Sequence, residues 1–96
     1  MVRWGIISFL SRIKEKFSRK PLMYSSRICE DCQAAKKFFV AHEISIQIKY
    51  IEDKGIREEL AAKYGKVLVP TIIIAGKKFI GFEDNEKEIK KRLKID

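Results

Sequence analysis

The stretch from Leu22 to Cys32, which reads LMYSSRICEDC, decides the fold of this chain. Its first four residues are typical of a short strand, and the residues that follow it, from Gln33 to His42, have the apolar spacing of a helix. The only two cysteines, Cys29 and Cys32, therefore stand where a strand leads into a helix. Residues three apart share a helical face, so the two sulfurs can meet, and the helix dipole favours a thiolate on the first.

Such a pair suits dithiol–disulfide exchange, in which one sulfur attacks a disulfide and the second resolves the mixed disulfide. Cys29 is the expected nucleophile, and Cys32 is the expected resolving thiol, one turn further in and more buried. We expect Arg27 to add positive potential, whereas the acids at positions 30 and 31 repel a neighbouring thiolate. Lys36 shares a face with Cys32, where it could pair with either acid or assist proton transfer.

The alternative interpretation of the cysteines is a structural or metal-binding pair. A mononuclear zinc site normally needs four protein ligands, and beyond two cysteines the chain offers only His42 as a nitrogen ligand. A metal would therefore have to bridge two chains, and we expect no metal in a single chain. The competing functional hypothesis is a non-catalytic binding or adaptor module, either a metal-bridged dimer or a protein brought to a membrane by its N-terminal segment.

Composition and charge limit the class of protein. Ninety-six residues allow one small domain, and two cysteines this close cannot staple a fold, which favours a reducing, cytoplasmic setting. The net charge of +8 is uneven: residues 1–20 carry six basic groups and one acid, whereas residues 21–96 carry fifteen basic groups and twelve acids. The domain itself is only mildly basic, which argues against a nucleic-acid partner.

Residues 1–20 form an appendage that Pro21 separates from the domain at residues 21–96. Over residues 3–19 the apolar side chains fall on one face of a helical wheel and basic and polar side chains on or near the other. We expect this basic amphipathic helix to bury its apolar stripe either against the domain or against a second copy of the chain. In the second case the protein would be a homodimer. Peripheral binding to an anionic membrane is the alternative. No apolar stretch is long enough to span a bilayer.

Periodicity within residues 21–96 predicts an α/β domain. The expected elements after the cysteine helix are a strand at residues 44–51, a helix at residues 54–64, a hairpin of strands at residues 71–75 and 78–80, and a last helix at about residues 84–94. Asp84 or Asn85 is expected to cap this last helix. The order β-α-β-α-β-β-α, with one right-handed parallel crossover, predicts a four-stranded mixed sheet flanked by helices on both faces.

Over residues 21–96 the chain resembles the thioredoxin superfamily, and within it the glutaredoxin-like and NrdH-type redoxins. Four features carry the resemblance: the C-x-x-C motif after the first strand, Val69-Pro70-Thr71 before the third strand, the turn at Gly76-Lys77, and Gly81-Phe82-Glu83-Asp84 opening the last helix. The resemblance implies a thioredoxin-like fold, a redox-active disulfide with no other cofactor, and a role as an oxidoreductase in electron transport and cell redox homeostasis.

The resemblance also implies the substrate-binding residues. The Val69-Pro70 bond should be cis and lie against the active-site disulfide, with the Val69 backbone bonding a substrate chain. Gly81 should allow another backbone to approach closely. The segment around Phe82, Glu83 and Asp84 resembles the family's site for the γ-glutamyl end of glutathione, and Arg27 completes the expected set.

The implied partners are disulfide-containing client proteins and an electron donor, either a thioredoxin-reductase-type flavin enzyme or glutathione. This chain departs from the family pattern because Glu30 and Asp31 replace the usual proline and aromatic residue, and Ser26 replaces a common lysine. We therefore expect a less stabilised Cys29 thiolate, a more reducing couple and poor use of glutathione. Ile28 stands where thioredoxins have tryptophan.

Overall fold

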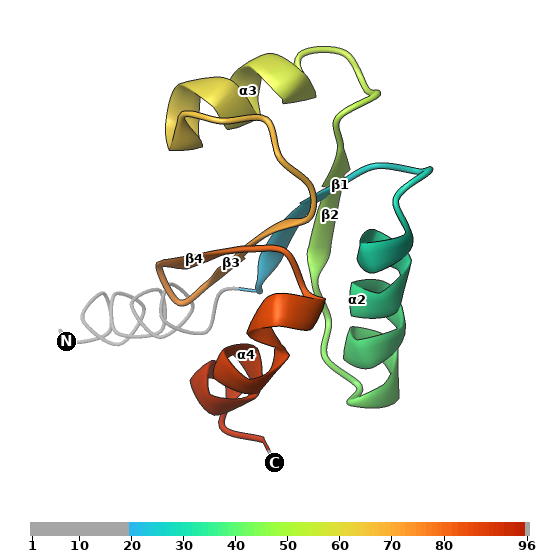
Figure 1. The fold of residues 1–96 in the computed structure, drawn as a ribbon, viewed down its shortest axis with the longest axis vertical. Helices are drawn as coiled ribbons and strands as arrows, with labels where there is room; N and C mark the ends of the chain where they lie inside the picture. The colour runs from blue at the N-terminus through green and yellow to red at the C-terminus, as the bar shows by residue number, and fades with distance from the viewer. Residues whose placement is uncertain (1–19, 96) are drawn as a thin grey trace, which may run out of the picture.

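The computed structural model describes residues 20–95, which follow the predicted order of strands and helices (Figure 1). The elements are β1 (Leu22–Ser25), α2 (Glu30–Ala41), β2 (Gln47–Tyr50), α3 (Ile56–Tyr64), β3 (Thr71–Ile74), β4 (Lys77–Ile80), the 3₁₀ turn η1 (Glu83–Asn85) and α4 (Glu86–Leu93). The predicted helix over residues 3–19 lies outside the described residues. Within residues 20–95, no helix has the length and apolar character needed to cross a membrane.

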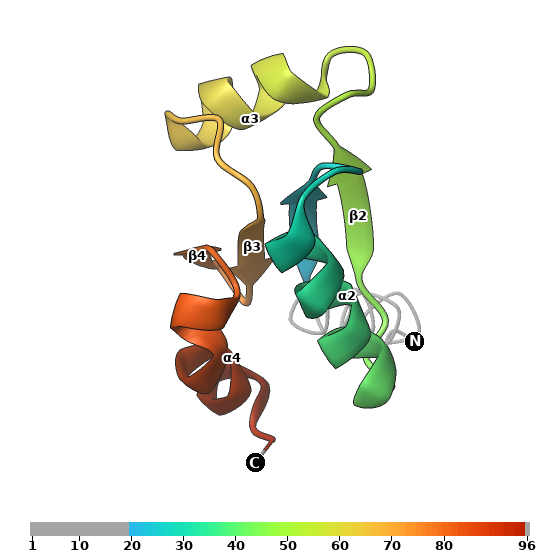
Figure 2. The same ribbon diagram turned by 45° about the vertical axis from the view of Figure 1, so that its right-hand side comes forward.

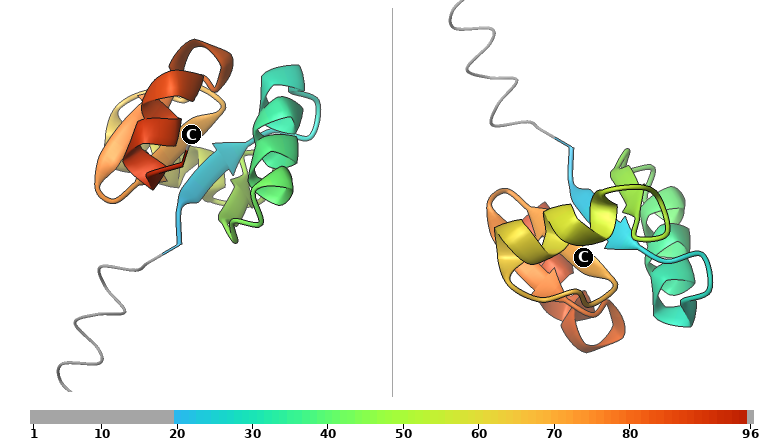
Figure 3. Two further views of the ribbon diagram at one scale, coloured as in Figure 1. Left: turned by 90° about the horizontal axis from the view of Figure 1, so that it is seen from below. Right: turned by 90° about the horizontal axis from the view of Figure 1, so that it is seen from above.

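The four strands form one mixed sheet in the order β2-β1-β3-β4. The central strand β1 pairs in parallel with β2 and antiparallel with β3, and β4 returns antiparallel beside β3. Helices α2 and α4 lie on one side of the sheet and α3 on the other (Figure 1 and Figure 2). In Figure 3, α4 lies in front of the strands in the view from below, and α3 lies in front of them in the view from above. The predicted fold is therefore confirmed.

A row of apolar side chains crosses the sheet on the side of α2 and α4. Met23 pairs with Ile48 on one side and with Ile72 on the other, and Ile72 pairs with Phe79. The helices and η1 supply the rest of this core, which includes Ala35, Phe38, Phe39, Phe82 and Ile89. Each large apolar side chain that is fully buried here stabilises the fold by about 1.5–3 kcal/mol.

The opposite face is held partly by polar contacts. Leu60 is the buried side chain of α3, and the ring of the buried Tyr24 contacts Tyr64 edge-to-face with centroids 6.0 Å apart. The Tyr24 hydroxyl donates a hydrogen bond of 2.5 Å to Glu59, which also accepts one of 2.7 Å from Lys49 on β2. Burial, more than the neighbouring carboxylate, raises the pKa of the Tyr24 hydroxyl above its usual value.

Strand β2 is shorter than the alternation over residues 44–51 predicts. It pairs over four residues because β1, its one partner strand within residues 20–95, has four residues. Pairing ends at Gln47, whose N–H donates to the carbonyl of Pro21 at 2.8 Å. Pro21 has no N–H to continue the ladder. Ile44 and Ile46 still pack against the core, so their apolar spacing reflects burial without strand pairing.

The β3–β4 hairpin turns through two residues, both in the left-handed region. Ala75 has φ +49° and Gly76 has φ +85°, which is the pattern of a type I′ turn. Glycine adopts this conformation freely, whereas alanine adopts it at a cost. Arg92 of α4 supports the turn by donating to the carbonyls of Ile74 and Ala75, at 3.3 and 2.7 Å.

Replacing Ala75 with asparagine should therefore stabilise the domain. Asparagine tolerates the left-handed region better than alanine, so we expect the free energy of unfolding to rise by about 1 kcal/mol and the melting temperature by about 4–8 °C. Urea and thermal denaturation measure both quantities. The matched control is Ala61→Asn on the exposed face of α3, which should destabilise because asparagine is the poorer helix former. Equal destabilisation by both variants would contradict the role assigned to the turn.

Candidate active site

Four connections meet at one edge of the sheet. The end of β1 lies beside the end of β2 and the start of β3, since Ser25 pairs with Tyr50 and Tyr24 with Thr71. Thr71 in turn pairs with Ile80 at the end of β4. This edge therefore gathers the cysteine loop, the loop after β2, the Val69-Pro70 step and the segment from residue 81 to residue 84. Topology alone brings together these segments, which are distant in the sequence.

The cysteines stand at the start of α2 as predicted. Cys29 is the N-cap residue, with extended backbone angles (φ −100°, ψ 119°), and its sulfur accepts a hydrogen bond of 3.2 Å from the Cys32 backbone N–H. Cys29 is partly exposed, whereas Cys32 is completely buried. The N–H group and the positive end of the helix dipole both favour negative charge on the Cys29 sulfur.

Cys32 differs from Cys29 in its surroundings. Burial raises the pKa of the Cys32 thiol to about 11, and the hydrogen bond with Cys29 acts in the same direction. The Ser25 hydroxyl and the Ser26 backbone act the other way. At neutral pH Cys32 is therefore a protonated thiol shielded from solvent, and the accessible sulfur is that of Cys29.

Asp31, between the two cysteines, bonds to a distant segment. Its carboxylate accepts hydrogen bonds from the backbone N–H groups of Phe82, at 2.7 Å, and of Glu83, at 3.1 Å. Asn85 is the N-cap residue of α4, one of the two positions expected, but its side chain makes no capping bond and donates to the carbonyls of Ile80 and Gly81, at 2.8 and 2.9 Å. The sequence interpretation treated Asp31 only as a charge and missed its hydrogen bonds to Phe82 and Glu83.

The Val69-Pro70 bond is cis, as the resemblance implied. Pro70 is fully buried, and Val69 is half-buried. The carbonyl of Pro70 accepts a hydrogen bond of 2.8 Å from the N–H of Gly81, which has φ +91°. This hydrogen bond joins the end of β4 to the cis-proline step, and the left-handed φ of Gly81 is the conformation that favours glycine.

Arg27 and Lys36 both contact Tyr50 at the end of β2. The Arg27 guanidinium lies over the Tyr50 ring, 4.0 Å from its centroid, and donates to Asp53 at 3.1 Å, a bond that raises the already high Arg27 pKa. Lys36 donates to the Tyr50 hydroxyl at 2.9 Å, so the pairing with a motif acid, one of the possibilities raised from the sequence, is not the contact that it makes. Both side chains therefore bind residues at the end of β2 and in the loop that follows it.

The loop before Cys29 is tied to the loop after β2. The Ser26 hydroxyl donates to Glu52, whose carboxylate also accepts the Arg27 N–H at 3.3 Å. The hydrogen bond from Ser26 is the main reason why the Glu52 pKa lies below its usual value. The Ile28 N–H donates to the Ser26 hydroxyl at 3.3 Å, so the backbone entering Cys29 is held on its β2 side.

Two exposed apolar side chains flank the site and were missed as candidates. Ile28, directly before Cys29, is 90% exposed, and Leu68, directly before Val69, is 44% exposed. A large apolar residue next to a reactive cysteine was the available signal.

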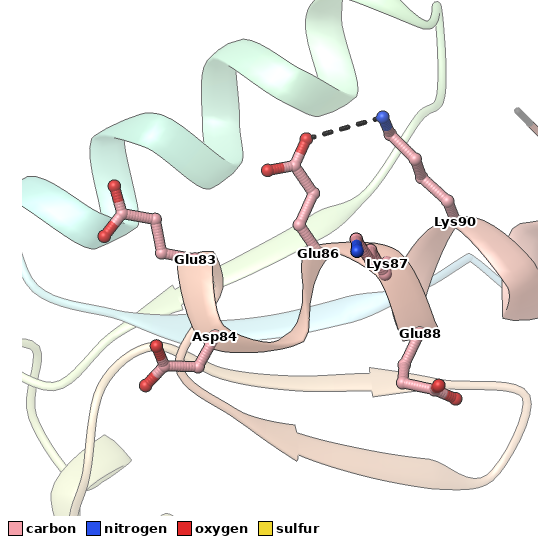
Figure 4. Close-up of a pocket in the computed structure, with 6 residues that line it drawn as sticks. All are labelled: Glu83, Asp84, Glu86, Lys87, Glu88 and Lys90. Atoms are coloured by element: carbon pink, nitrogen blue, oxygen red, sulfur yellow. Dashed lines mark ion pairs between the residues drawn. The ribbon is translucent and has the colours of Figure 1, made fainter.

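Glu83 and Asp84, two of the predicted residues, also line a hollow at the start of α4 (Figure 4). Their carboxylates point away from each other, and the other residues lining the hollow are Glu86, Lys87, Glu88 and Lys90, with an ion pair of 3.6 Å between Glu86 and Lys90. Neither cysteine lines it. Within residues 20–95, no group of three or more His, Cys, Asp or Glu side chains is placed to hold a metal.

The fold and the cysteine pair define a thioredoxin-like protein with a dithiol centre. The model of the glutaredoxin family matches residues 22–80, so the chain belongs to the glutaredoxin family. It is accordingly a thiol–disulfide oxidoreductase. No match was found among curated proteins.

Solved structures share the fold of this chain. A variant of the thioredoxin-like protein BC3987 is 23% identical with a TM-score of 0.71, and the match covers 81% of this chain and 99% of that one. A glutaredoxin from Archaeoglobus fulgidus is 21% identical with a TM-score of 0.65, covering 77% and 85% of the two chains. The dithiolic glutaredoxin 2-C-Grx1 from Trypanosoma brucei brucei is 27% identical with a TM-score of 0.59, covering 77% and 84%.

Proposed function

We propose that the protein reduces disulfides in client proteins through Cys29 and Cys32. The observation that carries this proposal is the pairing of a partly exposed Cys29 sulfur, at the start of α2, with a buried Cys32 whose N–H bonds to it. The accessible sulfur meets the client, and the shielded one resolves the complex. The redox group is the cysteine pair itself, and the proposed reaction uses no further cofactor.

The reaction takes place in two exchanges. The Cys29 thiolate attacks one sulfur of the client disulfide, forming a mixed disulfide and releasing the other client sulfur as a thiolate that takes up a proton. Cys32 then loses its proton and attacks the Cys29 sulfur, forming the Cys29–Cys32 disulfide and releasing the second client thiol. Two electrons pass to the client, and a flavin reductase of the thioredoxin-reductase type or glutathione returns them.

The client chain is expected to lie along the edge formed by Ile28, Leu68 and Val69, with the Val69 backbone bonding it. Exposed apolar side chains gain more from contact with a protein surface than with a small hydrophilic thiol. The test of the function is the reduction of insulin disulfides by the full chain, driven either by thioredoxin reductase with NADPH or by glutathione with glutathione reductase. No reduction under either condition, or with dithiothreitol as donor, would contradict the proposal.

Replacing Ile28 with serine should weaken the use of protein clients. Ile28 is 90% exposed, so folding is little affected, but apolar contact area beside the nucleophile is lost. We expect KM for insulin to rise about tenfold, which corresponds to roughly 1.4 kcal/mol of lost binding, while the turnover of a small disulfide such as hydroxyethyl disulfide stays within about twofold. Val40→Ser, at the exposed far end of α2, is the matched control. An equal loss of activity with insulin and with hydroxyethyl disulfide would show that Ile28 is not part of the surface that binds the client.

A further inference from the structure

The carboxylate of Asp31 makes a two-point bridge within the site. One of its oxygens accepts the Phe82 N–H at 2.7 Å and the other accepts the Glu83 N–H at 3.1 Å. These donors lie 51 and 52 residues further along the chain, at the start of the last helical segment. Both oxygens of the carboxylate and both N–H groups are therefore occupied by one internal contact.

The bridge also fills the space beside Gly81. A side chain added at Gly81 would meet the Asp31 carboxylate at 3.9 Å and the Asn85 amide nitrogen at the same distance. Gly81 itself bonds to the carbonyl of Pro70. The carboxylate of Asp31 therefore lies beside Gly81, the residue that connects β4 to the two N–H donors.

We propose that Asp31 is a specificity-determining residue that excludes thiol peptides bearing a free carboxylate, such as glutathione, from this site. Two adjacent backbone N–H groups that donate to the two oxygens of one carboxylate form charge-assisted hydrogen bonds, which are stronger than neutral ones. Here that carboxylate is supplied from within the C-x-x-C motif, at a high effective concentration that a free ligand has to overcome. The inference rests on the proposed function and names the substrate class: protein dithiols and disulfides in preference to carboxylate-bearing small thiols.

Charge and bridging are separable in this chain, because the motif holds two acids with different contacts. Glu30 is exposed in the first turn of α2, and Asp31 makes the bridge. Glu30→Gln removes one negative charge and keeps the bridge. Asp31→Asn removes one charge and leaves a single acceptor oxygen, and Asp31→Ala removes the bridge completely.

The experiment is a titration of the reduced, isotopically labelled full chain with S-methylglutathione, which keeps both carboxylates and cannot exchange disulfides. Amide shifts of Phe82 and Glu83 report occupancy of the two N–H groups. We expect the wild type and Glu30→Gln to bind weakly and within about twofold of each other, and Asp31→Ala to bind at least about tenfold more tightly, with saturable shifts at both amides. Asp31→Asn should fall between them.

Equal affinity of Asp31→Ala and the wild type for S-methylglutathione would overturn the inference. The same gain in affinity in Glu30→Gln as in Asp31→Ala would also overturn it, because the loss of one charge would then explain the whole effect. If Asp31→Ala does not fold, Asp31→Asn against Glu30→Gln makes the same comparison, and equal binding by those two variants overturns it. Insulin reduction by the wild-type chain is measured separately with dithiothreitol as donor. Its absence contradicts the proposed function whatever the titration shows.

Discussion

Replacing Cys29 with serine is expected to abolish disulfide reduction, with a loss of activity to the level of the assay without protein. The partly exposed Cys29 sulfur is the one that a client can reach, and Cys32 cannot substitute because it is buried and its pKa is raised to about 11. Iodoacetamide at neutral pH should accordingly modify Cys29 and spare Cys32 in the folded, reduced protein. Mass spectrometry of the alkylated protein measures the modification of each cysteine.

Replacing Cys32 with serine should have the opposite signature. Cys29 still attacks, but no second thiol resolves the mixed disulfide, so a client with a single exposed disulfide should accumulate as a covalent adduct. Non-reducing electrophoresis detects this adduct, and dithiothreitol releases it. Both variants should retain the melting temperature of the reduced wild type within a few degrees. Adducts formed by Cys29→Ser and none formed by Cys32→Ser would reverse the roles of the two cysteines.

The parts of the site that the sequence predicted are those that depend on neighbouring residues. The strand that ends at Ser25, the helix that begins after Cys29 and the hairpin at Gly76 all have their signals within a few positions of one another. Gly65 ends α3 with φ +84°, the conformation of a glycine C-cap that directly follows the helical run. Local patterns of this kind need no knowledge of which strands pair.

The parts that could not be predicted depend on strand register. Asp31 reaches Phe82 and Arg27 reaches Asp53 across 51 and 26 residues, because four connections end at one edge of the sheet. A charged residue in a first helical turn carries no signal of which distant N–H group it will meet. For the same reason, the sequence carried no signal that Lys36 would bond to Tyr50 on β2.

Strand length was misjudged for a related reason. The alternation of isoleucines begins at residue 44, before the point at Gln47 where β1 offers a partner, so the pattern overestimated the length of β2. The cis Val69-Pro70 bond was expected from the family resemblance alone, because few X-Pro bonds in folded proteins are cis. Family membership, supported by the match over residues 22–80, therefore contributed what periodicity could not.

Replacing Glu30-Asp31 with Pro-Tyr should raise the reduction potential by about 30 mV or more, a change of roughly tenfold in the equilibrium constant of the two-electron couple. Two negative charges beside Cys29 repel its thiolate and so disfavour the reduced form. Their removal stabilises the reduced form, which makes the couple more oxidising. Proline suits the first position of α2, where an N–H is not needed by the helix. Equilibration with dithiothreitol buffers of defined ratio, followed by thiol alkylation, measures the potential.

The single variants divide this effect between charge and bridge. Glu30→Gln removes an exposed charge, whose influence should shrink in 1 M salt because screening then acts within about 3 Å. Asp31→Asn weakens the contacts to Phe82 and Glu83 as well, so its effect should persist in salt. An unchanged or lower potential in the Pro-Tyr variant would show that the two acids do not make this couple more reducing, and the carboxylate of Asp31 would then act only through its contacts with the last helical segment.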